Sequence, residues 1–383
     1  MPQSCSHSQE VSVDMELMDV QNGSYTEYVL TETADELNLR YANTLLPLAT
    51  LFGVFCVLGI SGNIVVLCVF SHSREYKTTN FKVFVIGIAI IDLLTCITLI
   101  PAEILKTRHY FSFSSPLPCK VKCFSNLFAM TSSALVLMVN GVDRYRKVRQ
   151  PFKKQLSVRL AIACIVTMIV FSFVAAVPAA VMCGLQETNM TNIHKTLTTV
   201  TVCSAEDKYL DSKLRYAYKF GISLLLLCVS LALIVMYTLI IKTIAHHWKR
   251  RTNVSNNTNG QRPCVLVHNL ISKEQQATLA VQFHRQQSSS SPNSHQKLPY
   301  KSMIWIILTL IFLVTFFINA GLSFLSTKAL TFKPPTLLWY LIFYRLYFVN
   351  NVINPLIYAL IDNRFKRSCK ILLCQAGRLL HLN

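Results

Sequence analysis

Long uncharged stretches alternate with short polar segments along most of the chain. The first stretch, from Leu46 to Phe70, contains no charged residue. A helix rises about 1.5 Å per residue, so roughly 20 apolar residues cross the hydrocarbon core of a bilayer. The predicted fold class is therefore an all-α membrane protein, a seven-transmembrane helix bundle within residues 45–361. Its helices are expected at about 46–70, 81–105, 119–149, 158–183, 216–245, 301–327 and 334–361.

Two polar segments lie outside the predicted spans. Residues 1–44 are rich in acids and predict a flexible N-terminal tail. Residues 246–300 form a long connection that contains many Asn and Gln residues and the serine run 288–291. This composition is typical of a disordered linker. Within the loop before the fifth span, residues 196–203 alternate between Thr and apolar side chains, which is a strand pattern.

The C-terminal residues 362–383 predict a short amphipathic helix followed by a tail. Phe365, Cys369, Leu372 and Leu373 share one face, whereas basic side chains occupy the rest. Such a helix lies on the inner leaflet of a membrane. Cys369 and Cys374 are therefore candidates for palmitoylation.

The composition agrees with a protein that crosses the lipid bilayer several times. Mean hydropathy is +0.41 and only 14% of residues are charged. The net charge of +19 comes largely from basic residues on one side of the predicted spans. This asymmetry places that side in the cytoplasm and the N-terminus outside the cell, and it makes nucleic-acid binding unnecessary as an explanation. The N-terminus lacks a signal-peptide pattern, so we expect the first span to direct insertion.

Four cysteine residues lie near the outer ends of the third and fourth spans or in the loop that follows the fourth span. Cys119 and Cys203 both fall on the extracellular side, which is oxidising, so they predict a disulfide bridge. Cys123 and Cys183 are either a second bridge or two free thiols. Asn22 and Asn189 each begin a glycosylation sequon on the same side.

Polar residues within the spans are the candidate functional residues. Asp143-Arg144-Tyr145 ends the third span, and Asp143 can neutralise an arginine that a small rearrangement would release. The simpler alternative is a charged helix cap. Asp92 lies near the middle of the second span, where a carboxylate is costly unless it is paired or hydrated. Its alternative role is a protonated acid used only for packing.

The ordered combination of these features resembles the rhodopsin-like (class A) G-protein-coupled receptors over about residues 46–376, most nearly the neuropeptide-type receptors. The combination includes the Cys119–Cys203 pair, Asp143-Arg144-Tyr145 and the Asn354-Pro355-x-x-Tyr358 motif of the seventh span. The resemblance implies a plasma-membrane receptor that activates a heterotrimeric G protein, with arrestin and receptor kinases as further partners. It assigns coupling roles to Asp143, Arg144, Tyr145, Tyr237, Asn354, Pro355 and Tyr358. It also implies a bound sodium ion at Asp92, Ser133, Asn350 and Asn354, and no other cofactor.

The sixth span departs from the family pattern. Phe316 and Ile318 stand where the family has a tryptophan and a proline, and the fourth and fifth spans lack the family's tryptophan and proline. The family moves its sixth helix about that proline. A receptor that couples weakly, or not at all, therefore stays open as an alternative.

The ligand class can be narrowed by exclusion. Asn126 replaces the aspartate of amine receptors, and Phe348 replaces the lysine of opsins. The acidic tail and the strand-like outer loop favour a peptide. The expected ligand pocket consists of Glu103, Asn126, Phe316, Tyr340, Tyr344 and Arg345. Glu103 and Arg345 either contact a charged group of the ligand or pair with each other.

Other functions receive less support from the sequence. A lipid or small-molecule ligand is the alternative within the same fold. A transporter or channel would usually show internal repeats, and a membrane enzyme would need clustered catalytic groups. The sequence shows neither pattern, so we expect a receptor and not an enzyme.

Overall fold

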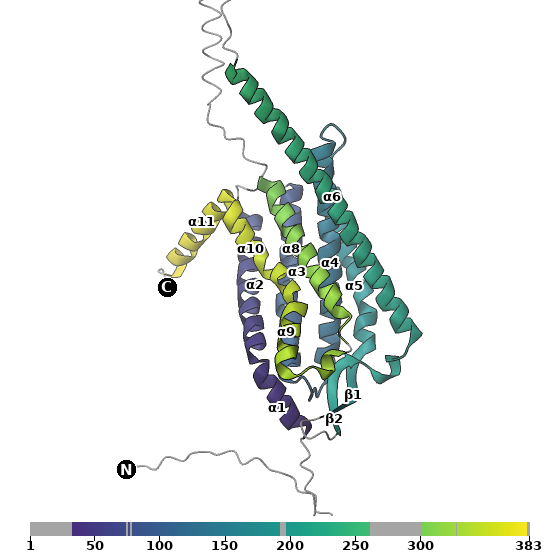
Figure 1. Ribbon diagram of the computed structural model, residues 1–383. Coiled ribbons are helices and arrows are strands. Elements are labelled where there is room, and N and C mark those ends of the chain that lie inside the picture. Colours follow the sequence, from purple (N-terminus) through teal and green to yellow (C-terminus); the bar gives the residue numbers. More distant parts are fainter. Residues whose placement is uncertain are drawn as a thin grey trace, which may run out of the picture.

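The computed structural model describes residues 33–73, 76, 79–191, 197–260, 300–326 and 328–380. Long helices pack side by side into one bundle (Figure 1), which confirms the predicted all-α membrane fold. Six of the described helices are long and apolar enough to cross a membrane. They are α2 (Leu46–His72), α3 (Asn80–Arg108), α4 (Pro116–Arg149), α5 (Val158–Met182), α6 (Lys213–Gly260) and α8 (Tyr300–Ser323).

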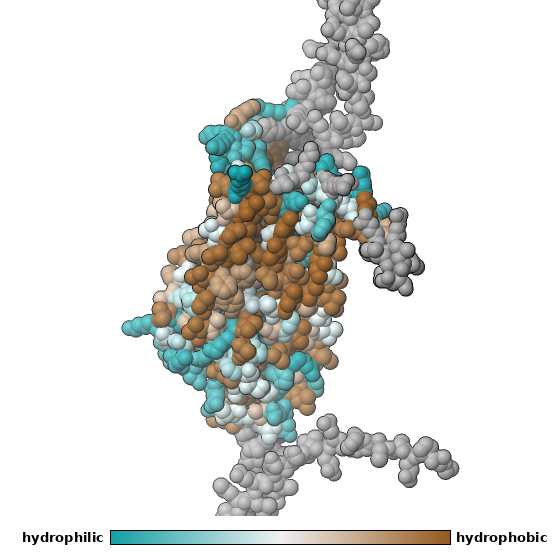
Figure 2. All heavy atoms as spheres, turned by 180° about the vertical axis from the view of Figure 1, so that it is seen from behind, coloured by the Kyte–Doolittle hydropathy of each residue, from teal (hydrophilic) through white to brown (hydrophobic). Residues whose placement is uncertain are grey.

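The face of the bundle seen in Figure 2 is largely apolar between two more polar ends. Val166, Val170 and Val174 of α5, for example, are all more than half exposed. A soluble protein would not leave such a surface open to water, whereas lipid tails cover it at no cost. The helices therefore present apolar side chains outward as well as inward.

The seventh predicted span, at residues 334–361, is interrupted. It consists of α9 (Pro334–Tyr344), a 3-10 turn η3 (Leu346–Phe348) and α10 (Val349–Ile361). At the interruption, the side chain of Asn319 in α8 donates a hydrogen bond of 2.8 Å to the carbonyl of Tyr344. A break inside a membrane is tolerated when such freed backbone groups find partners.

The predicted N-terminal tail is wrong in its last part, because residues 34–44 form helix α1 (Ala34–Thr44). Thr33 and Glu36 make a capping box at its start. Leu37 and Tyr41 lie one turn apart and are buried, and the hydroxyl of Tyr41 donates to the carbonyl of Phe332. The capping box and this packing explain why the segment is helical.

A β-hairpin covers the same end of the bundle as α1. Its strands are β1 (Cys183–Thr191) and β2 (Leu197–Ala205), which pair antiparallel along their whole length. The strand pattern at residues 196–203 predicted β2, but β1 begins where the fourth span was expected to end. Disulfides join Cys119 to Cys203, as predicted, and Cys123 to Cys183. We call this end of the bundle the hairpin end.

The opposite end carries α11 (Asn363–Leu380), which turns away from α10 (Figure 1). Asp362 precedes it and accepts hydrogen bonds from the backbone of Arg364 and the hydroxyl of Tyr76. Phe365 is buried, and its ring stacks on Phe70 of α2. The predicted short helix after the last span is thus fixed to the bundle by its first turn. We call this the α11 end.

Candidate functional site

Three helical segments bring charged side chains together at the hairpin end. Arg345, between α9 and η3, places its Nη2 atom 2.8 Å from Oε1 of Glu103 in α3. Lys122 of α4 places its Nζ atom 3.6 Å from the same oxygen. Glu103, Lys122 and Arg345 are each at most 8% exposed. We refer to these three residues as the charged cluster.

Of the two roles that the sequence left open for Glu103 and Arg345, the structure shows the mutual ion pair. Contact with a charged group of the ligand stays a prediction. The sequence analysis missed Lys122, although it lies one helical turn before the predicted pocket residue Asn126, and residues four apart share a helix face.

Aromatic residues surround the arginine of the charged cluster. The guanidinium of Arg345 lies 4.7 Å from the ring centroid of Tyr344 and donates to the hydroxyl of Tyr347 at 3.4 Å. That hydroxyl in turn donates to Oδ1 of Asn126 at 2.6 Å. Tyr347 was not predicted as a site residue, but it connects two residues that were.

The remaining predicted pocket residues differ in position. Tyr340 stacks on Tyr344 with centroids 5.3 Å apart, so it extends the aromatic wall of the charged cluster. Phe316 stacks instead on Phe312 and belongs to the hydrophobic core toward the α11 end. The structure therefore groups Phe316 with core packing and not with the charged cluster.

The predicted sodium residues lie on α3, α4 and α10. Asp92 is 2% exposed and accepts a hydrogen bond from Nδ2 of Asn354. Asn350 donates instead to Thr315 of α8 at 2.8 Å, and Ser133 is half-buried. Carboxylate, hydroxyl and amide oxygens suit a hard cation, so the donor chemistry fits sodium. The structure directly links only Asp92 and Asn354 of this set.

A second buried carboxylate lies at the α11 end. Asp143 is fully buried and accepts hydrogen bonds of 2.7 Å from both Asn80 of α3 and Lys147 of α4. Arg144 is farther away, with Nη2 at 3.7 Å. The predicted Asp143–Arg144 pair is present, but Lys147, which the sequence analysis did not consider, makes the shorter ion pair.

Arg144 itself is buried beside an aromatic ring. Its guanidinium lies 5.8 Å from the ring centroid of Phe81, and its Nε and Nη2 atoms have no hydrogen-bond acceptor among the described residues. Buried donors without acceptors are costly. An external acceptor at this end would therefore lower the energy of the arginine. Tyr145, the next residue, is half-buried beneath Arg149.

The tyrosines predicted to rearrange around Arg144 are both buried. Tyr237 of α6 accepts a hydrogen bond from Asn140 of α4 at 3.3 Å. Gly141 permits this approach, because a Cβ there would lie 2.9 Å from the Met236 side chain. Tyr358 of α10 packs against Phe70 at 5.9 Å and is 1% exposed.

Proline and glycine bring α10 close to α2. A Cβ on Gly62 would lie 2.8 Å from Cγ of Pro355, so only glycine fits there without a shift. Asn63 is next in sequence and donates to the carbonyl of Asn351 at 2.8 Å. The predicted coupling motif of the seventh span is therefore held directly against α2.

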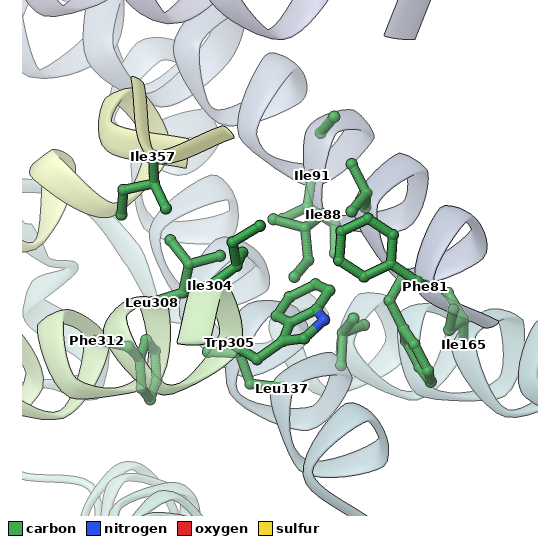
Figure 3. Close-up of a cluster of buried hydrophobic side chains, with 14 of the residues drawn as sticks. Phe81, Ile88, Ile91, Leu137, Ile165, Ile304, Trp305, Leu308, Phe312 and Ile357 are labelled. Atoms are coloured by element: carbon green, nitrogen blue, oxygen red, sulfur yellow. The ribbon is translucent and has the colours of Figure 1, made fainter. Parts of the chain in front are cut away.

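A tryptophan that the sequence analysis did not identify occupies the centre of the core toward the α11 end. Trp305 of α8 is fully buried among apolar side chains (Figure 3). Its ring meets Phe81 and Phe84 of α3 edge-on, at 5.9 and 6.3 Å. It thus joins α8 to α3 by packing, eleven positions before Phe316.

This architecture is that of a seven-helix membrane receptor, with a charged cluster at one end and an acid–arginine pair at the other. The sequence model of the family described as 7 transmembrane receptor (rhodopsin family) matches residues 62–358, and the chain belongs to this family. The family consists of receptors, which confirms the expectation of a receptor and not an enzyme.

Individual relatives share part of the chain. It is similar to neuropeptide FF receptor 2 of Mus musculus, 31% identical over 40% of this chain and 38% of that protein. It is also similar to the type-1 angiotensin II receptor B of Rattus norvegicus, 26% identical over 57% of this chain and 59% of that protein. Neuromedin-U receptor 2 of Mus musculus is 29% identical over 33% of this chain and 32% of that protein. The chain thus spans less than two thirds of the length of these relatives.

Proposed function

We propose that this chain is a plasma-membrane receptor whose hairpin end and N-terminus lie outside the cell. Two observations support this orientation. The hairpin end holds both disulfides, and disulfides persist in oxidising compartments. The α11 end is basic, as the positive-inside rule requires of the cytoplasmic side. Its basic residues include Lys153, Lys154, Arg364, Lys366 and Arg367.

We propose an extracellular peptide as the ligand and a heterotrimeric G protein as the partner at the α11 end. The observation that carries this proposal is the buried charged cluster, because α3 and α4, which supply its Glu103 and Lys122, also hold Asn80 and Asp143 at the other end. Receptors for neuropeptide FF, angiotensin II and neuromedin-U among the relatives support a peptide. In this proposal Arg144, with its buried donors, contacts the G protein.

The test is G-protein activation in cells that express the chain and are exposed to a library of secreted peptides. We expect at least one peptide to activate, and Arg144→Ala to lower that response at least tenfold at equal surface expression. The unfolding temperature of both forms is measured in parallel, because Arg144 is buried and its truncation also removes packing against Phe81. An unchanged response in Arg144→Ala would contradict the coupling role. Silence across the library, in cells that answer a lipid library, would replace the peptide by a lipid ligand.

A receptor that couples weakly is the second candidate, and the structure of α8 favours it. Proline is absent from the sequence of α8, and Trp305 anchors this helix to α3. Recruitment of arrestin, after phosphorylation by receptor kinases and without G-protein activation, would identify such a receptor.

Sodium binding at Asp92 and Asn354 belongs to the same proposal. Replacement of sodium by choline in the medium should raise agonist affinity if these two residues hold the ion. Asn189 is exposed on β1, which makes it accessible for glycosylation, while Asn22 lies outside the described residues. Of the two palmitoylation candidates, Cys374 is exposed and Cys369 packs against the core.

A further inference from the structure

The charged cluster contains more positive than negative charge. Besides Lys122 and Arg345, a third basic residue, Lys106, lies one turn after Glu103 on α3. Its charge interacts with those of Lys122, Arg345 and Glu103. The carboxylate of Glu103 thus pairs with Lys122 and Arg345, and a third cation, Lys106, lies on the same helix one turn away.

Like charges repel each other, and burial strengthens the repulsion between Lys106, Lys122 and Arg345 because water screens it less. Glu103 cannot balance both lysines, since its Oε1 atom already lies 2.8 Å from Arg345. Arg345 also retains a donor, because its buried Nε has no hydrogen-bond acceptor among the described residues. The arrangement has both the charge and the free donor to bind an anion.

The sides of this group are not equally accessible. Lys106 is half-buried and extends over the ring of Tyr110 at 5.7 Å, whereas Lys122 and Arg345 are more than nine-tenths buried. Tyr344 and Asn126 are also half-buried. An anionic group that arrives from outside would therefore meet Lys106 first and Lys122 next.

We propose that Lys106, Lys122 and Arg345 form a subsite that binds a carboxylate of the peptide ligand, with Glu103 as the internal counterion. The proposal rests on the proposed function in so far as the anion belongs to a peptide. Cationic donors fixed in a poorly hydrated site suit a carboxylate, because charge-assisted hydrogen bonds are the strongest that side chains make. The carboxylate belongs either to the C-terminus of the peptide or to an acidic side chain.

The test uses small carboxylate probes and requires no known agonist and no G protein. The full chain is purified in detergent, and its unfolding temperature is measured with N-acetylphenylalanine, with N-acetylaspartate amide and with the uncharged amide of each. N-acetylphenylalanine represents a C-terminal carboxylate, and N-acetylaspartate amide represents an acidic side chain. We expect one carboxylate probe, but not its uncharged partner, to raise the unfolding temperature in a concentration-dependent way.

Two variants locate the binding. Lys122→Met should weaken binding of the effective probe roughly tenfold or more, as expected for one lost charge-assisted contact. Lys120→Met is the matched control, because Lys120 pairs with Glu206 outside this group. Without probe, the unfolding temperature of Lys122→Met is measured as well, because the variant loses the 3.6 Å ion pair with Glu103 and also removes a like charge near Lys106. If Lys122→Met does not fold, Lys106→Met serves the same comparison.

The outcomes are decisive for the subsite independently of signalling. Equal effects of the carboxylates and their amides, or unchanged affinity in the variant that folds, would overturn the proposal. Carboxylate binding that depends on Lys122, in a chain that activates no G protein, would uphold the subsite and reject the coupling function.

Discussion

The two ends of the bundle each bury a carboxylate beside basic side chains, but they use it differently. At the hairpin end, Glu103 of α3 contacts Lys122 of α4 and Arg345 at the break of the seventh span. At the α11 end, both cations of Asp143, which are Arg144 and Lys147, come from its own helix. The first group joins three segments, whereas ion pairs of the second stay within α4.

This difference shows what holds the helices together at each end. The ion pairs of the charged cluster must break before its three segments can separate. At the α11 end, α8 is joined to α3 by the apolar contacts of Trp305 with Phe81 (Figure 3) and with Phe84. Separating α8 from α3 at this end would cost these apolar contacts but would break no ion pair of Asp143, since both of the pairs described for it lie within α4.

Of the substitutions that test this comparison, removal of the Glu103 carboxylate should lower stability the most. Glu103→Gln leaves Lys122 and Arg345 buried without their counterion, and loss of one partner of a buried ion pair costs about 3–5 kcal/mol. We expect greatly reduced surface expression and an unfolding temperature lowered by several degrees in detergent. The double variant Glu103→Gln with Arg345→Met should recover part of the loss.

Glu206→Gln is the control for this prediction, because Glu206 makes partly exposed ion pairs at the same end. If Glu103→Gln were as stable as Glu206→Gln, the hairpin end would not depend on its buried charges and the comparison would fail.

Truncation of Trp305 tests the other end. Trp305→Ala removes a fully buried ring and should cost about 3 kcal/mol, with a cavity between α8 and α3. Because this ring joins the two helices, we also expect ligand-independent G-protein activation to rise at equal surface expression. Trp305→Phe should show a smaller effect of both kinds. A fall in basal activity together with the loss of stability would mean that the ring supports the active arrangement instead.

The smallest effect is expected from the partly exposed acid of the hairpin end. Hydrogen bonds from Lys120 and Lys208 lower the pKa of Glu206 below its usual value of 4.5. A carboxylate with a lowered pKa contributes its full stabilisation above the ordinary pKa, and this contribution is lost as the pH falls from the ordinary pKa through the lowered one. Unfolding temperatures measured between pH 7 and pH 3 should therefore converge for wild type and Glu206→Gln at the acidic end. A constant difference across this range would contradict the role of the ion pairs.

Hydropathy was sufficient to predict the helical membrane fold, because each helix that crosses the lipid bilayer must consist mainly of apolar residues. It could not predict the break at Arg345, since a pattern of apolar residues continues across it and the partner that satisfies the backbone, Asn319, lies on another helix. Helix α1 was missed for a related reason. Its burial depends on contacts with distant segments, such as that of Tyr41 with Phe332.

The residues of the candidate sites were only partly predictable. Glu103 and Arg345 stood out because charge is rare within apolar spans. Lys122 did not stand out near the polar end of its span, and Trp305 looked like any apolar residue of α8. Which helix faces meet depends on how each helix is rotated about its axis, and one sequence does not contain that rotation in readable form. For the same reason Phe316 was placed in the pocket, whereas the structure places it in the core.

Helix α4 has a mechanical consequence for any signal that crosses this molecule. It is one helix of 34 residues, about 50 Å long, and its first turns are cross-linked to both strands of the hairpin through Cys119 and Cys123. The hairpin and α4 therefore move largely as one rigid unit, which extends from the outer strands to Arg144. Distance measurements between spin labels should use α4 as the fixed reference, with displacement sought in α6 and α8.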